Sequence, residues 1–432
     1  MLDFKTYHNW MGKYKKTLNF DFYIETEVLD EIKKYYKLCD NILLNFDEKK
    51  ANKSLLDRRN TAYDQITIVC KPYEGCSHNC FYCYDKTAQD KKIIDKDKLI
   101  YFFKQINNEY SHVNWIWHGG EFTELPIEWF TSVMDELTLI NLKNDYKTSF
   151  IAQSSGTFPK EWEDLLKKYN LKCGISYDFA ESRNYTLTED QINKFSSIIT
   201  VLNRYNINKM EDIYLFCSKN NICLSFNLPF GGAFLSQKQI MGYDNQYYID
   251  KIEDFIFNDY LWDSDGVQER LSDTLILLSL GMTENVVCSF QKNCIADTNI
   301  ITLFNDCSIR KCDSSKCDEF LLLDDCSKYK DRTSLNYMNF AKLNEEKLSQ
   351  EKCKNCLCNT VCRGGCLEVW LKQEDGLNCL LFKQILPKLY NVLGDLTEEE
   401  FIKLNPYVRH LLIQNSYIPS NIIEKRVLCK TE

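Results

Sequence analysis

Residues 65–83 read QITIVCKPYEGCSHNCFYC, a short apolar stretch followed by three closely spaced cysteines. The β-branched residues at its start predict a strand, so Cys76, Cys80 and Cys83 would lie on the loop at the carboxyl end of that strand. Three thiolates on one short loop can hold three corners of an iron–sulfur cube and leave the fourth iron open to a ligand. The same spacing also suits a zinc loop, with His78 or a distant cysteine as the fourth ligand.

The size and charge of the chain narrow the class of protein. The chain has 432 residues and a mass of 51.0 kDa, which suggests about two to four folding units. Hydrophobic residues make up 44% and charged residues 27%, a balance typical of a packed globular protein. The formal net charge of -9, from 62 acidic and 53 basic residues, disfavours a broad phosphate-binding surface. We therefore expect no nucleic-acid partner.

Cysteine is unusually frequent, with 21 residues. In a small secreted domain such a count indicates a disulfide framework, but this chain is long and its first residues lack the layout of a signal peptide. The apolar runs, such as Leu275–Leu278, are far too short to span a membrane. We therefore expect a cytoplasmic protein with no membrane contact, whose cysteines mainly bind metal.

Strands and helices alternate from about residue 63. The pattern predicts strands at Gln65–Cys70, Val113–Trp117, Thr148–Gln153, Cys173–Ser176, Ile198–Leu202 and Ile222–Asn227. It predicts helices between them at Asp95–Asn107, Ile127–Leu139, Lys160–Lys168 and Lys209–Asn220. Such alternation favours an α/β fold with a parallel sheet, closed or partly closed into a barrel. Reactive groups in these folds gather at the carboxyl ends of the strands.

A second motif, His118–Glu121, follows the second predicted strand and reads HGGE. Together with the three-cysteine loop and the aromatic Tyr82 between its last two cysteines, it resembles the radical S-adenosylmethionine (SAM) superfamily. The resemblance covers roughly residues 63–230. It implies a partial (β/α)6 barrel similar to a TIM barrel, and a [4Fe-4S] cluster whose open iron binds the amino and carboxylate groups of SAM.

The resemblance also implies which residues contact SAM. Tyr82 would belong to the cofactor site, and Gly119, Gly120 and Glu121 would receive the SAM amino group, since glycines let the backbone approach a ligand closely. The family motif usually continues with proline, which Phe122 replaces here.

Further SAM contacts are implied after the later strands. Ser176 ends the fourth strand, where the family often has a Ser-x-Asp-Gly segment, although Phe179 replaces the glycine. Ser176 would contact the ribose or carboxylate of SAM, Arg183 would pair with the carboxylate, and Leu228 would contact the adenine. An ordinary polar group at a strand end explains Ser176 and Arg183 equally well, and core packing explains Leu228.

A second cysteine region extends from residue 288 to residue 379. Its C-x5-C pair and its later C-x2-C-x5-C-x3-C run resemble the SPASM domain, the cysteine-rich extension of many peptide-modifying radical SAM enzymes. The resemblance implies two auxiliary [4Fe-4S] clusters, and hence three clusters in the whole chain. The ligands of the first auxiliary cluster would be Cys288, Cys294, Cys312 and Cys366. The ligands of the second would be Cys353, Cys356, Cys362 and Cys379.

Additional cysteines lie close to these implied ligands, namely Cys307, Cys317, Cys326 and Cys358. Cys307 stands where the SPASM pattern usually has glycine, and any of the four could replace a ligand named above. Without the resemblance, the same spacings could hold structural zinc. The total number of thiolates is therefore better defined than the individual ligands.

Asp313 directly follows Cys312. In the sulfatase-maturing members of this group an aspartate at this place is thought to remove a proton from the substrate, so the resemblance makes Asp313 the candidate general base. A solvated aspartate, or one that caps backbone amides, is an equally good explanation.

We expect four parts of the chain. They are an N-terminal segment (1–62), the radical SAM core (63–285), the SPASM domain with the auxiliary clusters (286–385) and a helical tail (386–432).

These resemblances together predict a radical SAM oxidoreductase that acts on a peptide or protein. It would use SAM to oxidise or crosslink side chains of a ribosomally made precursor peptide, through a thioether or carbon–carbon bond. A low-potential donor of the flavodoxin or ferredoxin type would supply electrons. One alternative is an anaerobic sulfatase-maturating enzyme that makes formylglycine, and an alternative of another class is a zinc-stabilised binding module without catalysis.

Overall fold

The computed structural model describes most of the chain after residue 64. The described residues are 65–78, 80–84, 91–179, 185–229, 235–282, 290, 300–310, 312, 321–322, 346–347, 349–354, 356, 358–362, 365–366, 369, 376–415 and 417. The chain divides into two compact units, Met1–Gln65 and Ile66–Glu432, and the described residues belong almost entirely to the second. The expectations for residues 1–62, Arg183, Cys288, Cys294 and Asp313 therefore lie outside the described residues.

The described strands form a single nine-stranded sheet with the order β6-β5-β4-β3-β2-β1-β7-β8-β9. Their bounds are β1 Gln65–Cys70, β2 His112–Trp117, β3 Thr148–Ser154, β4 Lys172–Ser176, β5 Ser197–Val201, β6 Cys223–Asn227, β7 Ile300–Leu303, β8 Ser308–Arg310 and β9 Leu321–Leu322. Successive strands from β2 to β6 pair in parallel, and β7 pairs in parallel with β1. The six predicted strands are confirmed, each to within one residue at either end.

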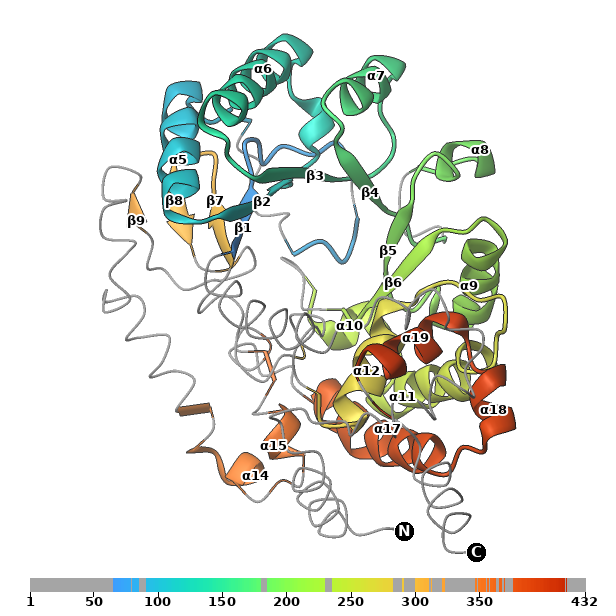
Figure 1. Ribbon diagram of the computed structural model, residues 1–432. Coiled ribbons are helices and arrows are strands. Elements are labelled where there is room, and N and C mark those ends of the chain that lie inside the picture. The colour runs from blue at the N-terminus through green and yellow to red at the C-terminus, as the bar shows by residue number, and fades with distance from the viewer. Residues whose placement is uncertain are drawn as a thin grey trace, which may run out of the picture. The chain divides into compact units, whose positions relative to one another are not determined.

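The helices lie mainly in the connections between these strands. Their bounds are α5 Lys96–Glu109, η2 Phe122–Glu124, α6 Ile127–Asn144, α7 Lys160–Lys168, α8 Glu189–Ile192, η3 Ile207–Lys209, α9 Met210–Lys219, α10 Gln237–Met241, α11 Asn245–Asp254, η4 Phe255–Tyr260, α12 Arg270–Ser279, α14 Glu351–Lys354, α15 Asn359–Cys362, α17 Gly376–Gly394, α18 Glu398–Lys403 and α19 Pro406–Gln414. The strands follow an arc, with α5, α6 and α7 on its outer side (Figure 1). This mixed α/β architecture with a mainly parallel sheet is the predicted fold class.

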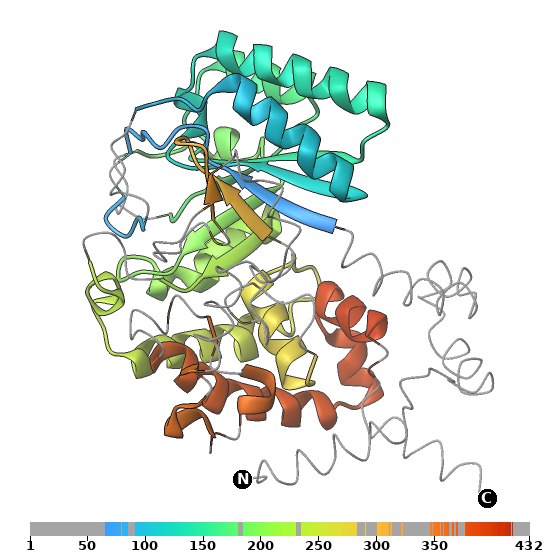
Figure 2. The same ribbon diagram turned by 90° about the vertical axis from the view of Figure 1, so that its left-hand side faces the viewer.

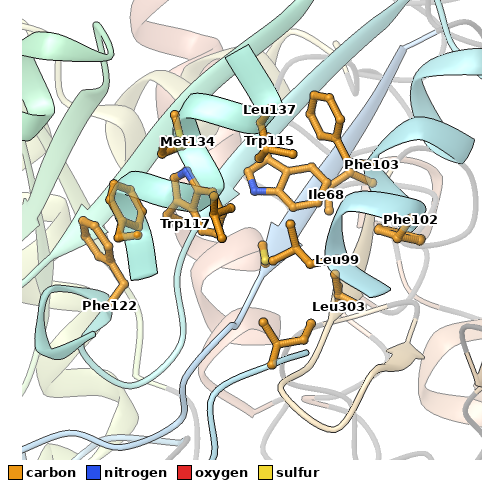
Figure 3. Packing of buried hydrophobic residues seen from close by; sticks show 14 of the residues in the cluster. Ile68, Leu99, Phe102, Phe103, Trp115, Trp117, Phe122, Met134, Leu137 and Leu303 are labelled. Atoms are coloured by element: carbon orange, nitrogen blue, oxygen red, sulfur yellow. The ribbon is translucent and has the colours of Figure 1, made fainter. Parts of the chain in front are cut away.

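The hydrophobic core between the sheet and α5–α6 fixes the position of β2. Trp115 and Trp117 on β2 are fully buried, and the ring centre of Trp115 lies 5.4 Å from that of Phe103 (Figure 3). The ring centre of Trp117 lies 5.2 Å from that of Phe130. Burial of each such side chain stabilises the fold by about 2 kcal/mol or more. Since β2 leads directly into the HGGE motif, this packing holds the motif at the edge of the sheet.

A second helical layer packs against the far end of the sheet. Helix α12 contacts β6, and α17 packs against both α11 and α12 (Figure 2). Helix α17 runs continuously through residue 386, where the sequence places the start of the helical tail. Within the described residues, none of the helices has the length and apolar character needed to cross a membrane.

Candidate functional site

The three-cysteine loop leaves the carboxyl end of β1, as the sequence predicts. Cys80 and Cys83 are half-buried and lie on one turn, in which the Cys83 N–H donates to the Cys80 carbonyl at 3.2 Å. Cys76 is exposed. The loop therefore presents its three thiols from a short segment at the edge of the sheet.

The first half of this loop is fastened to the end of β2. The Glu121 N–H donates to the Gly75 carbonyl at 3.0 Å, and the Ser77 N–H donates to Glu124 Oε1 at 2.7 Å. Gly120 has φ +39°, and a Cβ at this position would lie 2.1 Å from the Gly75 oxygen. A glycine is required here because any side chain would push the cysteine loop away from the HGGE motif.

The second half of the loop is fastened to the ends of β3 and β4. His78 Nε2 and Thr157 Oγ1 are 2.9 Å apart, just after β3. The Tyr82 hydroxyl donates to Asp178 Oδ2 at 3.0 Å, just after β4, and the Asp178 side chain is fully buried. The aromatic residue between the last two cysteines therefore has a fixed orientation.

The Glu121 carboxylate accepts hydrogen bonds from neighbouring residues of the protein. It is 3% exposed; Oε1 accepts from the hydroxyls of Thr123 at 2.7 Å and Ser154 at 2.8 Å, and Oε2 accepts from the Ser155 N–H at 2.7 Å. These bonds join the end of β2 to the end of β3. A contact between Glu121 and the SAM amino group, which remains a prediction, would use the backbone most readily.

The other predicted SAM contacts lie at the same edge of the sheet. Ser176 Oγ accepts from Gln153 Nε2 at 2.9 Å, and Leu228 follows β6 and is 9% exposed. Phe179 has φ +54°, the left-handed conformation that favours glycine. The backbone turn expected from a Ser-x-Asp-Gly segment is thus present although the glycine is not.

The described cysteines of the second region lie on several elements: Cys353 is in α14, Cys362 ends α15, and Cys379 is in α17. The Cys356 N–H donates to the Cys353 carbonyl at 3.2 Å, and the Gly365 N–H donates to the Cys362 carbonyl at 2.9 Å. Cys353 and Cys362 are each 8% exposed, whereas Cys312, Cys356, Cys366 and Cys379 are half-buried.

Cys307 lies in the turn between β7 and β8, with φ +67° and 8% exposure. Its N–H donates to the Phe304 carbonyl at 2.9 Å. This positive φ is the left-handed conformation that favours glycine. The thiol packs in the core between the sheet and α5.

The residues present suit an iron–sulfur cube on the first loop. Its three thiols come from one segment, and Gly120 lets that segment pack directly against the HGGE motif. Among the described residues, no three His, Cys, Asp or Glu side chains converge on one point as a single metal ion requires. A cube binds each thiolate at a different iron, so its ligands surround the cube and do not meet at one point.

Several residues that shape the site were not found from the sequence. They are Lys71, Glu124 and Thr157, which lie beside the cysteine loop or bond to it. Lys71 directly follows β1 and Thr157 lies three residues after β3, and that position was the signal that could have revealed them.

Two curated relatives of the chain are cysteine-type anaerobic sulfatase-maturating enzymes. The relative from Clostridium novyi is 23% identical over 334 residues, which cover 70% of this chain and 87% of the relative. The relative from Clostridium perfringens is 24% identical over 385 residues, which cover 77% of this chain and 99% of the relative. No family model matches the chain.

Solved structures share the fold. The structure of anSMEcpe with bound AdoMet has a TM-score of 0.63 at 22% identity and covers 76% of this chain and 98% of that protein. The structure of Streptococcus suis SuiB bound to S-adenosylmethionine has a TM-score of 0.51 at 14% identity and covers 80% of this chain and 86% of SuiB. The arrangement of sheet and helices described above is therefore one that these two proteins also have.

Proposed function

We propose that the chain, which is similar to two cysteine-type anaerobic sulfatase-maturating enzymes, is a radical SAM enzyme that binds SAM and oxidatively modifies a side chain of a peptide or protein. The observation that carries this proposal is the attachment of the three-cysteine loop to the ends of β2, β3 and β4. This attachment places three thiols, the HGGE backbone and the later strand ends around one region of the sheet edge.

The residues of the chain would bind and orient the reactants. Cys76, Cys80 and Cys83 would hold the cluster, and Gly119 and Gly120 would let SAM approach the backbone. The cluster and SAM, when bound, supply the radical chemistry that removes a hydrogen atom from the substrate. The Tyr82–Asp178 hydrogen bond would keep the aromatic side of the loop in place during this step.

The second cysteine region would hold two auxiliary clusters with the ligand sets given above. Fully cysteine-ligated clusters have no open iron, so they would accept the electron that the substrate loses. Asp313 would accept the proton that leaves at the same stage. The electron that starts the reaction would come from a flavodoxin- or ferredoxin-type donor.

Two products fit this scheme. A crosslink within a ribosomally made precursor peptide fits the fold shared with SuiB. Formylglycine formation in a sulfatase fits the two curated relatives, which the matches cover over 87% and 99% of their lengths. Both reactions remove two electrons from a peptide side chain and differ in the bond that forms afterwards.

The test is an anaerobic assay of the reconstituted protein with SAM and a chemical reductant. One reaction contains a small peptide encoded beside the gene, and another contains a cysteine peptide from a sulfatase. Mass spectrometry then distinguishes loss of two hydrogens with an internal bond from formation of an aldehyde that reacts with a hydrazide.

The cysteine loop provides the matched control. Cys83→Ala should abolish 5′-deoxyadenosine formation, whereas Cys173→Ala removes a half-buried thiol outside the ligand spacings and should not. Undiminished SAM cleavage by the Cys83→Ala variant would refute the assignment of the loop.

A further inference from the structure

Lys71 is a fully buried lysine at the base of the cysteine loop. It follows β1 directly, its backbone N–H donates to the Leu303 carbonyl of β7 at 2.8 Å, and its side chain is 0% exposed. Lysine is among the residues least often buried completely, because removing its charge from water is unfavourable. A lysine at this place therefore calls for a specific electrostatic role.

The ammonium group of Lys71 lies against two aromatic rings. Its Nζ is 5.3 Å from the ring centre of Tyr84 and 5.2 Å from that of Phe304. Tyr84 directly follows Cys83, so the charge lies close to the end of the cysteine loop. Cation–π contacts of this kind stabilise a desolvated cation.

A second cation lies on the same ring. The guanidinium carbon of Arg310 is 4.4 Å from the ring centre of Phe304, and Arg310 precedes the implied ligand Cys312 by two residues. The order Tyr84–Lys71–Phe304–Arg310 thus connects the first cysteine loop with the second cysteine region.

Both cations lie on the face of the sheet opposite the helix-covered core. Cys70 pairs with Leu303, and Ile309 pairs with Leu303 on the other side; these three residues belong to that core. The alternating positions Arg310, Thr302 and Ser308 point the other way. Thr302 and Ser308 each bury a hydroxyl that has no hydrogen-bond partner within the described chain. This inner face therefore carries positive charge and hydrogen-bond donors, which suit an anionic neighbour.

We propose that Lys71 and Arg310 are positioning residues that supply fixed positive charge to the two neighbouring iron–sulfur sites and favour their reduced forms. The inference rests on the proposed function, since it requires clusters at both places. Reduction adds one negative charge to a cluster, and a cation at a distance on the order of 10 Å would stabilise that charge by Coulomb attraction. With an effective dielectric constant near 20, its loss shifts the ratio of reduced to oxidised cluster by about tenfold at a fixed potential.

The packing of Lys71 can be separated from its charge. A Cβ at Gly119 would lie 2.5 Å from Lys71 Cβ, so the aliphatic stem of Lys71 fills the space beside the HGGE motif. Methionine reproduces this stem without the charge, and arginine keeps the charge. Lys71→Met and Lys71→Arg therefore form a matched pair.

The experiment is a redox titration of the reconstituted holoenzyme, followed by electron paramagnetic resonance. The signal that changes when SAM is added identifies the cluster of the first loop. Lys71→Met should lower the midpoint potential of this cluster, Lys71→Arg should retain it, and Arg310→Met should lower mainly the potential of an auxiliary cluster. Iron content and the melting temperature of each variant show whether the fold is intact.

Unchanged potentials in Lys71→Met and Arg310→Met proteins with full iron content would overturn the inference. If Lys71→Met does not retain iron, the titration of Arg310→Met decides the question. Failure of the proposed function has a different signature, because the wild-type protein would then lack a SAM-responsive cluster.

Discussion

At the scale of single residues, the site depends on backbone positions that only glycine fills without strain. Gly119 and Gly120 both have positive φ, and each faces neighbouring protein at a distance that leaves no room for a side chain. Gly365 also has positive φ, at +71°, but a Cβ there would meet no atom within 4 Å. An alanine at Gly365 would therefore add backbone strain alone, whereas an alanine at Gly119 or Gly120 would add both strain and a steric clash.

We expect Gly120→Ala to lower the free energy of unfolding by about 3 kcal/mol or more, since it adds a clash with the Gly75 carbonyl to the strain of positive φ. Gly365→Ala should lower it by about 1 kcal/mol, from strain alone. Urea unfolding of the two metal-free variants measures both values. Equal losses would show that the Gly75–Gly120 approach is not rigid in solution.

From the sequence, the positions of single site residues could be predicted better than their bonding partners. The HGGE motif located Glu121 correctly at a strand end, but the sequence could not show that Ser154 and Ser155 occupy its carboxylate, because these partners lie more than 30 positions away. Phe179 and Cys307 appeared as departures from a glycine pattern. Only the structure shows that the backbone keeps its positive φ at both.

At the scale of elements, one buried carboxyl group joins the sheet to the second helical layer. Glu269 caps α12 by accepting from the N–H groups of Leu271 at 2.9 Å and Ser272 at 2.7 Å, and it also accepts from the Phe226 N–H of β6 at 2.8 Å. Burial raises the pKa of Glu269 from 4.5 to about 7, in spite of these bonds.

This pKa shift predicts how stability depends on pH. The folded state binds the Glu269 proton more tightly than the unfolded chain does. The resulting contribution to the free energy of unfolding is therefore fully present below about pH 4.5. It is lost as the pH rises towards about 7, by about 3 kcal/mol in all.

Glu269→Gln should remove this part of the slope of the free energy of unfolding against pH. Glu253→Gln removes the ion-pair partner of Lys388 and should leave that slope unchanged. Urea unfolding between pH 4.5 and pH 8 measures the slopes. Burial also raises the pKa of Asp273, so a residual slope of the same sign is expected in the Glu269→Gln variant. The same slope in both variants would contradict the assignment to Glu269.

Regular elements with clear periodicity were predictable, and short ones were not. Helix α7 has the predicted bounds, because Trp162, Leu165 and Leu166 form an apolar stripe between polar residues. Helix α6 extends five residues beyond its prediction and ends where Asp145 adopts the left-handed conformation. The short strands β7 and β8 lie in the cysteine-dense region, where the apolar pattern is too brief to identify a strand.

At the scale of the whole described unit, one sheet connects the two cysteine regions. Strand β1 leads into the first cysteine loop, and β7, its parallel neighbour, leads through β8 to Cys312. The described sheet continues from β6 to β9 without interruption, so it has strands on both sides of residue 286, where the sequence predicts the start of the SPASM domain. Long-range pairing of this kind cannot be read from local periodicity.

The implied ligands of the auxiliary clusters can be tested by comparing Cys356 with the neighbouring Cys358. Cys356 is half-buried and is an implied ligand, whereas Cys358 is 2% exposed and belongs to no implied set. Cys356→Ala should still form 5′-deoxyadenosine, but the amount of product per deoxyadenosine should fall to near zero because the substrate electron has no acceptor. Cys358→Ala should keep this ratio and lower the free energy of unfolding by about 1 kcal/mol, as expected for a small core cavity.

Iron analysis completes the comparison, because a lost cluster could also unfold its surroundings. The Cys356→Ala variant should lose the iron of one cluster, and the Cys358→Ala variant should lose none. The reverse pattern, with uncoupling and iron loss in the Cys358→Ala variant only, would make Cys358 the ligand and Cys356 the spare thiol. That exchange would alter the ligand set but preserve the role of the second cysteine region as electron acceptor, since the uncoupling itself reports that role.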